Sequence, residues 1–255
     1  AFRRFVERTQ IPVANTFMAK GVISDRHPLS LHTVGLQARD WVSCGFDRAD
    51  VVIAVGYDLA EYSPARWNPE RDKRIIHIDQ APAEVDRHFI LETGLIGGIS
   101  NALDALAERV TPRDPKVARS LHEAIHQEMT ELEGDDAFPV KPQRLLADLR
   151  KALAPADIVL SDVGAHKMWI ARMYETHEPN TIAAKLIHPD RTVVAVCGDG
   201  GFLMNVQELE TAVRIGTPIV VVIFHDDRYG LIEWKQMRDF GRASHVSFGN
   251  PDFVK

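Results

Sequence analysis

The stretch that decides the fold is VVAVCGDGGFLMNVQELETAVRIGTPIVVVIFHDDRYG, residues Val193–Gly230. Its two apolar runs, TVVAVC and PIVVVIF, each end at a turn that contains aspartate. Short β-branched runs are typical of buried parallel strands, and the helical pattern between them completes a strand–helix–strand unit. Ligands of such sheets bind beyond the carboxyl ends of the strands, so the two acidic turns are predicted to share one edge.

The first of these turns, CGDGG, has residue types that suit a diphosphate. Gly198, Gly200 and Gly201 allow close backbone approach and present N–H groups to phosphate oxygens at the start of a helix. Asp199 and Asp226 supply hard carboxylate oxygens, and Mg²⁺ is commonly held by one or two carboxylates plus substrate phosphates. A single Asp-Gly turn is more often only a helix cap or a turn former. Two such acids across one unit favour a metal site.

Composition limits the classes of function. The 255 residues, 45% hydrophobic and 26% charged, suit a soluble globular protein with one large or two ordinary domains. A net charge of -6 with scattered Lys and Arg argues against nucleic acid as a partner. Cys44 and Cys197 lack metal-type spacing, which disfavours disulfide scaffolds and zinc sites. The absence of a signal peptide and of a run of about 20 apolar residues predicts a cytoplasmic protein without a membrane partner.

The predicted fold class is α/β, with two doubly wound parallel-sheet domains. The first, residues 1–112, has expected strands at Ile11–Phe17, Val51–Gly56 and Arg74–Asp79 and expected helices at Phe2–Thr9 and Ile99–Val110. Residues 113–140 are interpreted as a connecting segment with a helix around Leu121–Leu132. The second domain, residues 141–255, has expected helices at Pro142–Leu153, Lys167–Tyr174 and Met204–Gly216 and expected strands at Asp157–Asp162, Thr192–Cys197 and Pro218–Phe224.

The sequences GDGGFLMNVQELETAVR and HDDRYG together resemble the thiamine diphosphate motif. The resemblance implies thiamine diphosphate and Mg²⁺ as cofactors, with Asp199, Asp226 and the backbone carbonyl of Arg228 as the metal ligands. Most relatives have asparagine in place of Asp226, and many have asparagine in place of His225. The implied cofactor-binding residues in this part of the chain are Gly198, Asp199, Gly200, Gly201, Asp226, Tyr229, Gly230 and Leu231.

A second motif indicates which group of thiamine diphosphate enzymes the chain resembles. The sequence SDVGAHKMWIARMY resembles the turn of acetolactate synthases that contacts the far side of the diphosphate, which implies contacts from Val163, Gly164, Ala165 and His166. A lone histidine is more often a surface or capping residue, but a place directly after a strand favours the cofactor contact. VGYDLAEYSPARWN and IIHID are similar to the central domain of catabolic, pyruvate-condensing acetolactate synthases. The implied reaction joins two pyruvate molecules into 2-acetolactate with loss of CO₂, in a homodimer or homotetramer with active sites at chain interfaces.

The chain also departs from this family. Relatives have a Gly- and Ala-rich stretch between the equivalents of Thr181 and Ile182, which supplies an apolar side chain that shapes the cofactor. The family's amino-terminal pyrimidine-binding domain, with its activating glutamate, has no counterpart here, so the catalytic acid is unassigned. We expect these residues to be part of a longer chain and to be inactive alone. Lys235 stands where biosynthetic relatives have a tryptophan that favours 2-ketobutyrate. Trp234, one place earlier, is equally compatible with ordinary core.

Other interpretations stay open at this point. No G-x-G-x-x-G fingerprint follows a strand, so FAD is not expected to be required. Asp79 ends a strand, where it could bind a ribose or simply form a turn. The alternative functions are another thiamine diphosphate 2-ketoacid decarboxylase, of the benzoylformate or pyruvate type, and a non-catalytic nucleotide-binding module.

Overall fold

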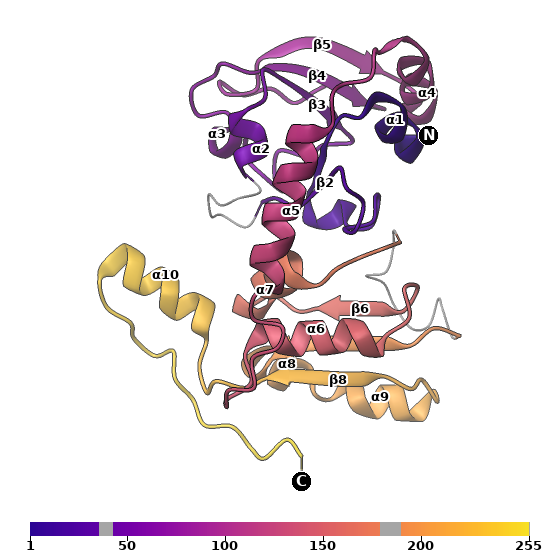
Figure 1. The fold of residues 1–255 in the computed structure, drawn as a ribbon. Coiled ribbons are helices and arrows are strands. Elements are labelled where there is room, and N and C mark those ends of the chain that lie inside the picture. The colour runs from indigo at the N-terminus through magenta and orange to yellow at the C-terminus, as the bar shows by residue number, and fades with distance from the viewer. Residues whose placement is uncertain (36–42, 179–189, 255) are drawn as a thin grey trace. The chain divides into compact units, whose positions relative to one another are not determined.

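The computed structural model describes residues 1–35, 43–178 and 190–254, which form two compact units (Figure 1). The first unit consists of Ala1–Glu131 with Glu175–Pro179, and the second consists of Leu132–Tyr174 with Asn180–Lys255. The division near Glu131 falls inside the segment that the sequence predicts to be a connection. The predicted parallel α/β class is confirmed, because every pair of neighbouring strands within the described ranges is parallel.

The first unit contains two parallel sheets. One pairs β1 (Val13–Asn15) with β2 (Ser30–Thr33), and the other has the order β3 (Val51–Val55), β4 (Arg74–Asp79), β5 (Leu91–Ile96). Its helices are α1 (Phe2–Thr9), α2 (Ser43–Asp47), α3 (Pro64–Trp67), α4 (Ile99–Arg109) and α5 (Lys116–Thr130), with a 3₁₀ turn at Phe17–Ala19. Helix α4 packs on both α1 and β4. The apolar core therefore gathers Phe5 and Val6 from α1, Ile78 from β4 and Leu103 from α4.

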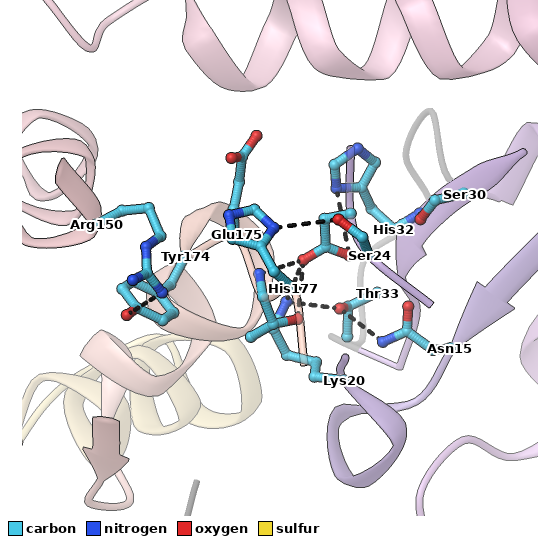
Figure 2. A network of polar contacts seen from close by, with 12 residues as sticks. Asn15, Lys20, Ser24, Ser30, His32, Thr33, Arg150, Tyr174, Glu175 and His177 are labelled. Carbon is cyan, nitrogen blue, oxygen red and sulfur yellow. Dashed lines mark hydrogen bonds and ion pairs between the residues drawn. The ribbon is translucent and has the colours of Figure 1, made fainter. Parts of the chain in front are cut away.

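The second unit has one sheet, in the order β6 (Ile158–Ser161), β7 (Val193–Gly198), β8 (Val220–Phe224). Its helices are α6 (Pro142–Ala152), α7 (Ala165–Met173), α8 (Asp199–Asn205), α9 (Glu208–Arg214) and α10 (Gly230–Phe240). A buried Arg150 on α6 donates a hydrogen bond to the Tyr174 hydroxyl at 2.7 Å, which joins α6 to the end of α7 (Figure 2). Strand β7 lies in the middle, so its end is flanked by the turns that follow both neighbouring strands.

Several elements differ from the sequence-based expectations. The single helix expected over Met204–Gly216 is two helices, α8 and α9, and the first already begins at Asp199. Strands β2 and β5 were not predicted, because SLHT is short and polar and LETGLI contains glycine and few β-branched residues. Helix α10 was not predicted either. The predicted gap at Thr181 and Ile182 lies outside the described residues. None of the helices in the described ranges has the length and apolar character needed to cross a membrane.

A buried ion pair ties Glu175–Pro179 to the rest of the first unit (Figure 2). Asp25 is fully buried, and its Oδ2 lies 3.5 Å from Lys20 Nζ. The backbone N–H and the hydroxyl of Thr176 both donate to the same Oδ2, at 2.8 and 3.1 Å, while the N–H of Asp25 donates to the Thr176 carbonyl at 2.9 Å. Burial raises the pKa of Asp25, but Lys20, His32 and the Thr176 hydrogen bonds together hold that pKa below its usual value.

His32 lies beside this ion pair with 1% of its surface exposed and an unusual backbone φ of 59°. Its ring stacks on His122 of α5 at 5.7 Å, and neither of its ring nitrogens has a hydrogen-bond partner. Its Nδ1 is 3.9 Å from Asp25 Oδ1, too far for a hydrogen bond. Burial lowers the pKa of His32 to about 4, although the charge of Asp25 acts in the opposite direction. His32 is therefore neutral at pH 7.

We expect His32 to make the protein acid-sensitive. Its pKa is about 4 in the folded chain and returns to the ordinary histidine value of 6.5 on unfolding, so its stabilising effect is complete above about pH 6.5 and is lost towards pH 4. This difference corresponds to roughly 3 kcal/mol. His32→Asn removes the titration and suits the left-handed backbone. Urea midpoints should fall less between pH 7 and pH 4 in this variant than in the wild type, and equal falls would contradict the assignment.

Candidate cofactor site

Three turns meet at the carboxyl edge of the sheet in the second unit. Gly198 at the end of β7 pairs in register with Phe224 at the end of β8, and the turn after β6 lies on the other side of β7. His166 at the start of α7 stacks on Phe224, with ring centroids 5.8 Å apart. A Cβ atom placed on Gly198 would lie 3.4 Å from the same imidazole. The structure thus brings the predicted groups after β6, β7 and β8 together.

The Asp199 carboxylate is the centre of this edge and is only 2% exposed. Its Oδ2 accepts hydrogen bonds from the backbone N–H groups of Asp226 and Asp227, at 3.1 and 2.8 Å, and from the side-chain amide of Asn250 at 2.6 Å. Its Oδ1 accepts from the N–H of Gly200 at 2.8 Å. Asp199 therefore holds the turn after β8 in place through that turn's own backbone.

Asp226 lies close enough to Asp199 for the two charges to interact. Partial burial raises the pKa of Asp226, and the negative charge of Asp199 raises it further. Oδ2 of Asp226 would be 3.1 Å from a Cβ on Gly230, so the glycine leaves room for this carboxylate at the start of α10. Two acids that repel each other at one sheet edge are an arrangement that a divalent cation would stabilise.

A second group of possible ligands also includes Asp199. Single ligand atoms of Asp199, His225 and Asp227 lie within 4.8 Å of one another. His225 Nε2 is 3.0 Å from Asp227 Oδ1, and hydrogen bonds from His225 and Asn250 lower the pKa of Asp227. The sequence did not predict this group, which shares only Asp199 with the expected ligand set.

The turn after β8 is closed by an antiparallel bridge between Arg228 and Ser247. The two hydrogen bonds of the bridge run from the N–H of Tyr229 to Val246 at 2.8 Å and from the N–H of Phe248 to Asp227 at 3.0 Å. The Arg228 carbonyl takes no part in these two bonds, as its predicted role as a metal ligand requires. The Arg228 side chain points to Glu233, with an N–O distance of 3.2 Å.

Three glycines at this edge are required by close packing, and the tightest is Gly201, where a Cβ would overlap the Asp162 carboxylate. A Cβ on Gly200 would lie 2.6 Å from the Tyr229 ring and 3.2 Å from Phe248, and a Cβ on Gly164 would lie 2.7 Å from the imidazole of His166. His166 itself is 5% exposed, and burial lowers its pKa. Its Nε2 has no hydrogen-bond partner. The interpretation of His166 as a surface histidine is therefore wrong.

The remaining predicted residues lie at the margin of the site. Val163 is 73% exposed in the turn after β6, and Leu231 is half-buried in the first turn of α10. Trp234 is 48% exposed and is covered on one face by the guanidinium of Arg238, 4.9 Å from the ring centroid. The interpretation of Trp234 as core is thus wrong for this chain, and Lys235 beside it is exposed.

Sequence reasoning missed Asn250 and Phe248, which reach the site from the segment after α10. In sequence, SFGNPD reads only as a turn, because Gly, Asn and Pro are all turn formers. The contact of this segment with Asp199 depends on the Arg228–Ser247 bridge, and no spacing rule indicates such a bridge across a helix.

Comparison with known proteins agrees with this geometry. Residues 1–106 match the thiamine pyrophosphate enzyme central domain, and residues 162–255 match the thiamine pyrophosphate enzyme C-terminal TPP binding domain. The chain belongs to the thiamine pyrophosphate enzyme family. The two matches assign the first unit to the central domain and the edge that carries Asp199 to the cofactor-binding domain.

Curated relatives extend the comparison. The chain is 32% identical over its whole length to an acetolactate synthase of Bacillus subtilis (strain 168), covering 49% of that protein. It is 33% identical over 81% of its length to a catabolic acetolactate synthase of Raoultella terrigena, covering 41% of it, and 30% identical over 91% to the thiamine pyrophosphate-containing protein YdaP of Bacillus subtilis, covering 43%. The chain spans about half the length of the curated relatives it matches.

The residues present fit a diphosphate bound together with a hard cation. Asp199 and Asp226 offer carboxylate oxygens, which are the ligands that Mg²⁺ prefers. The missing side chain of Gly200 lets the backbone at the start of α8 pack closely against Tyr229. The buried and unpartnered Nε2 of His166 adds a polar atom that needs a hydrogen-bond partner at the same edge.

Substitution of the acids should separate the two possible ligand sets. Asp199→Ala should weaken thiamine diphosphate binding strongly, because it removes the carboxylate common to both sets. Asp226→Asn should be tolerated, since an amide oxygen remains, whereas Asp226→Ala should weaken binding. Asp227→Ala should have a smaller effect than Asp226→Ala if Asp226 is the ligand. The measurement is titration calorimetry at matched Mg²⁺ concentration.

Two results would reject the assignment. Equal cofactor affinity in the wild type and in Asp199→Ala would contradict the assignment of any metal site to Asp199. A larger loss in Asp227→Ala than in Asp226→Ala would transfer the site to the group that contains His225.

Proposed function

We propose that this chain is the central and cofactor-binding part of an acetolactate synthase, which condenses two pyruvate molecules to 2-acetolactate and CO₂. The observation that carries the proposal is the buried Asp199 carboxylate at the carboxyl edge of β7, with the Asp226 turn bound to it. The alignment of the whole chain with acetolactate synthases supports the choice among thiamine pyrophosphate enzymes.

In the proposed site, Asp199, Asp226 and the Arg228 carbonyl would hold Mg²⁺, which would supply positive charge to neutralise a diphosphate. The N–H of Gly200 already donates to Asp199 Oδ1, so the N–H of Gly201, also at the start of α8, is the one that the proposal assigns to a phosphate oxygen. Bound thiamine diphosphate supplies the electron sink that allows a 2-ketoacid to lose CO₂. This chain's own contribution is to fix the diphosphate end of that group and to keep it in one orientation.

His166 has a separate role at the same edge. Because burial lowers its pKa, the imidazole is neutral at pH 7 and carries one N–H and one acceptor nitrogen. The hydrogen bond from the imidazole to the backbone of Asp162 uses that N–H, so the buried Nε2 is the acceptor nitrogen and would take a hydrogen bond from a donor group of the bound cofactor. The imidazole packs so closely against the backbone of Gly164 that a Cβ there would lie 2.7 Å from the ring, and this packing fixes the ring in position.

The acid that activates the cofactor is assigned to another part of the assembly. No glutamate of this chain is given that role, so the proposal places it on a partner chain in a homodimer or homotetramer with active sites at chain interfaces. Residues 1–255 alone should bind the cofactor weakly and form no acetolactate. Pyruvate is the proposed substrate, the cytoplasm the proposed location, and no flavin is required by the proposal.

The test of the reaction is product analysis with pyruvate, thiamine diphosphate and Mg²⁺. Acetolactate and CO₂ in equal amounts are the expected products, because the proposed enzyme joins the decarboxylated unit to a second ketoacid. Acetaldehyde in place of acetolactate would identify a decarboxylase instead. Cofactor binding without turnover in the intact assembly would leave only a non-catalytic binding role.

Competition between ketoacids tests the choice of second substrate. Lys235 stands at the place of the tryptophan that favours 2-ketobutyrate, and a flexible cation cannot provide a rigid apolar wall for one extra methyl group. One methylene in such a pocket is worth about 1 to 3 kcal/mol, or roughly 10- to 200-fold. With equal pyruvate and 2-ketobutyrate, the two products should therefore form at similar rates. A roughly tenfold excess of acetohydroxybutyrate would instead indicate that Trp234 provides the wall.

A further inference from the structure

The side chain of Asn250 connects Asp199, at the start of α8, to Asp227, in the turn after β8. Its Nδ2 donates to Asp199 Oδ2 at 2.6 Å and to Asp227 Oδ1 at 2.8 Å. An amide nitrogen has two N–H groups, so Asn250 uses both of them on carboxylates. Nothing in the sequence resemblance gives this residue a role.

The hydrogen bonds of Asp199 are distributed unequally between its two oxygens. Oδ2 accepts from three donors, the N–H groups of Asp226 and Asp227 and the amide of Asn250, whereas Oδ1 accepts only the N–H of the adjacent Gly200 among the bonds of the described residues. A carboxylate oxygen has about two lone-pair sites. Oδ2 is therefore saturated, and Oδ1 is the oxygen with capacity for a cation.

The amide oxygen of Asn250 gives a second, independent observation about how this side chain is oriented. Its Oδ1 is buried and has no hydrogen-bond partner. A buried acceptor without a donor costs free energy, so its retention needs a reason. The two N–H groups of the amide must face Asp199 and Asp227, and this orientation forces the oxygen into a place without a donor.

The position of Asn250 is fixed by the segment that carries it. Val246 is 5% exposed, and its carbonyl accepts the N–H of Tyr229. The Phe248 ring packs against the Tyr229 ring at 4.7 Å. These contacts hold the segment beside the turn after β8, so the amide of Asn250 approaches Asp199 from a constrained backbone.

We propose that Asn250 is a positioning residue of the cation site, which orients the Asp199 carboxylate by occupying Oδ2 and leaving Oδ1 for the metal. The inference rests on the proposed thiamine diphosphate and Mg²⁺ site. Partners that orient a ligand in this way typically contribute 10- to 100-fold to metal affinity. Asn250 itself does not bind the cation.

The test measures binding of Mn²⁺, a probe for Mg²⁺, by electron paramagnetic resonance in the presence of saturating thiamine diphosphate. Asn250→Ala should lower the Mn²⁺ affinity by about tenfold or more, because Asp199 loses one of the three donors that fix its rotation, and the only one that is a side chain. Asn250→Ser, which keeps one donor, should bind Mn²⁺ with intermediate affinity. Thermal unfolding without metal checks that both variants are folded.

Val246→Ala is the matched control on the same segment. It removes buried apolar contacts but leaves the amide of Asn250 and the carbonyl of residue 246 unchanged, so it should lower Tm while Mn²⁺ affinity stays close to that of the wild type. Wild-type affinity in Asn250→Ala would overturn the inference. An equal loss of Mn²⁺ affinity in Val246→Ala would also overturn it, because Asn250 would then act only through segment stability. Absence of Mn²⁺ binding in the wild type would instead reject the proposed function.

Discussion

A buried carboxylate needs hydrogen-bond donors, and the way in which Asp199 obtains them organises the second unit. Its donors come from the next residue, from the turn after β8 and from the segment after α10. The turn and the segment after α10 have little regular structure of their own, whereas Gly200 lies in α8. Without a common acceptor at the end of β7, the turn after β8 would lack its two backbone bonds to the sheet, and Asp226 would have no defined place.

The first unit also contains a buried carboxylate that is stabilised by hydrogen bonds from a distant segment of the chain. Asp25 is also fully buried, and it also accepts from the backbone N–H of a segment that is distant in sequence, here Thr176. The difference lies in the compensation of charge. Asp25 has Lys20 beside it, whereas Asp199 has only neutral N–H donors and a neighbouring Asp226 that increases the negative charge. In the first arrangement Lys20 compensates the charge, although the buried Oδ1 of Asp25 has no hydrogen-bond partner, and the second is the one that a cation would complete.

The sequence predicted the strands of the sheet and the acids at their ends because both depend on local pattern. Runs such as RIIHID and TVVAVC can form little else than buried strands, and β4 has the predicted bounds Arg74–Asp79. The sequence placed the CGDGG turn at the start of a helix, but it could not predict that His225 and Asp227 lie near Asp199. These features depend on the side-chain contacts of one turn. The role of Asn250 depends on a bridge between two turns, and no residue near position 250 signals it.

The assignment of Glu175–Pro179 to the first unit has a consequence for how this protein can be divided or recombined. The chain enters the second unit after Glu131, returns to the first at Glu175, and leaves again after Pro179. Neither unit is therefore a continuous block that a gene fusion could exchange between relatives. A cut after Glu131 would separate Asp25 from both Thr176 donors and leave a buried carboxylate with part of its hydrogen bonding missing. A division of the chain would therefore have to keep Glu175–Pro179 with the first unit, although the units have separate sheets and separate cores.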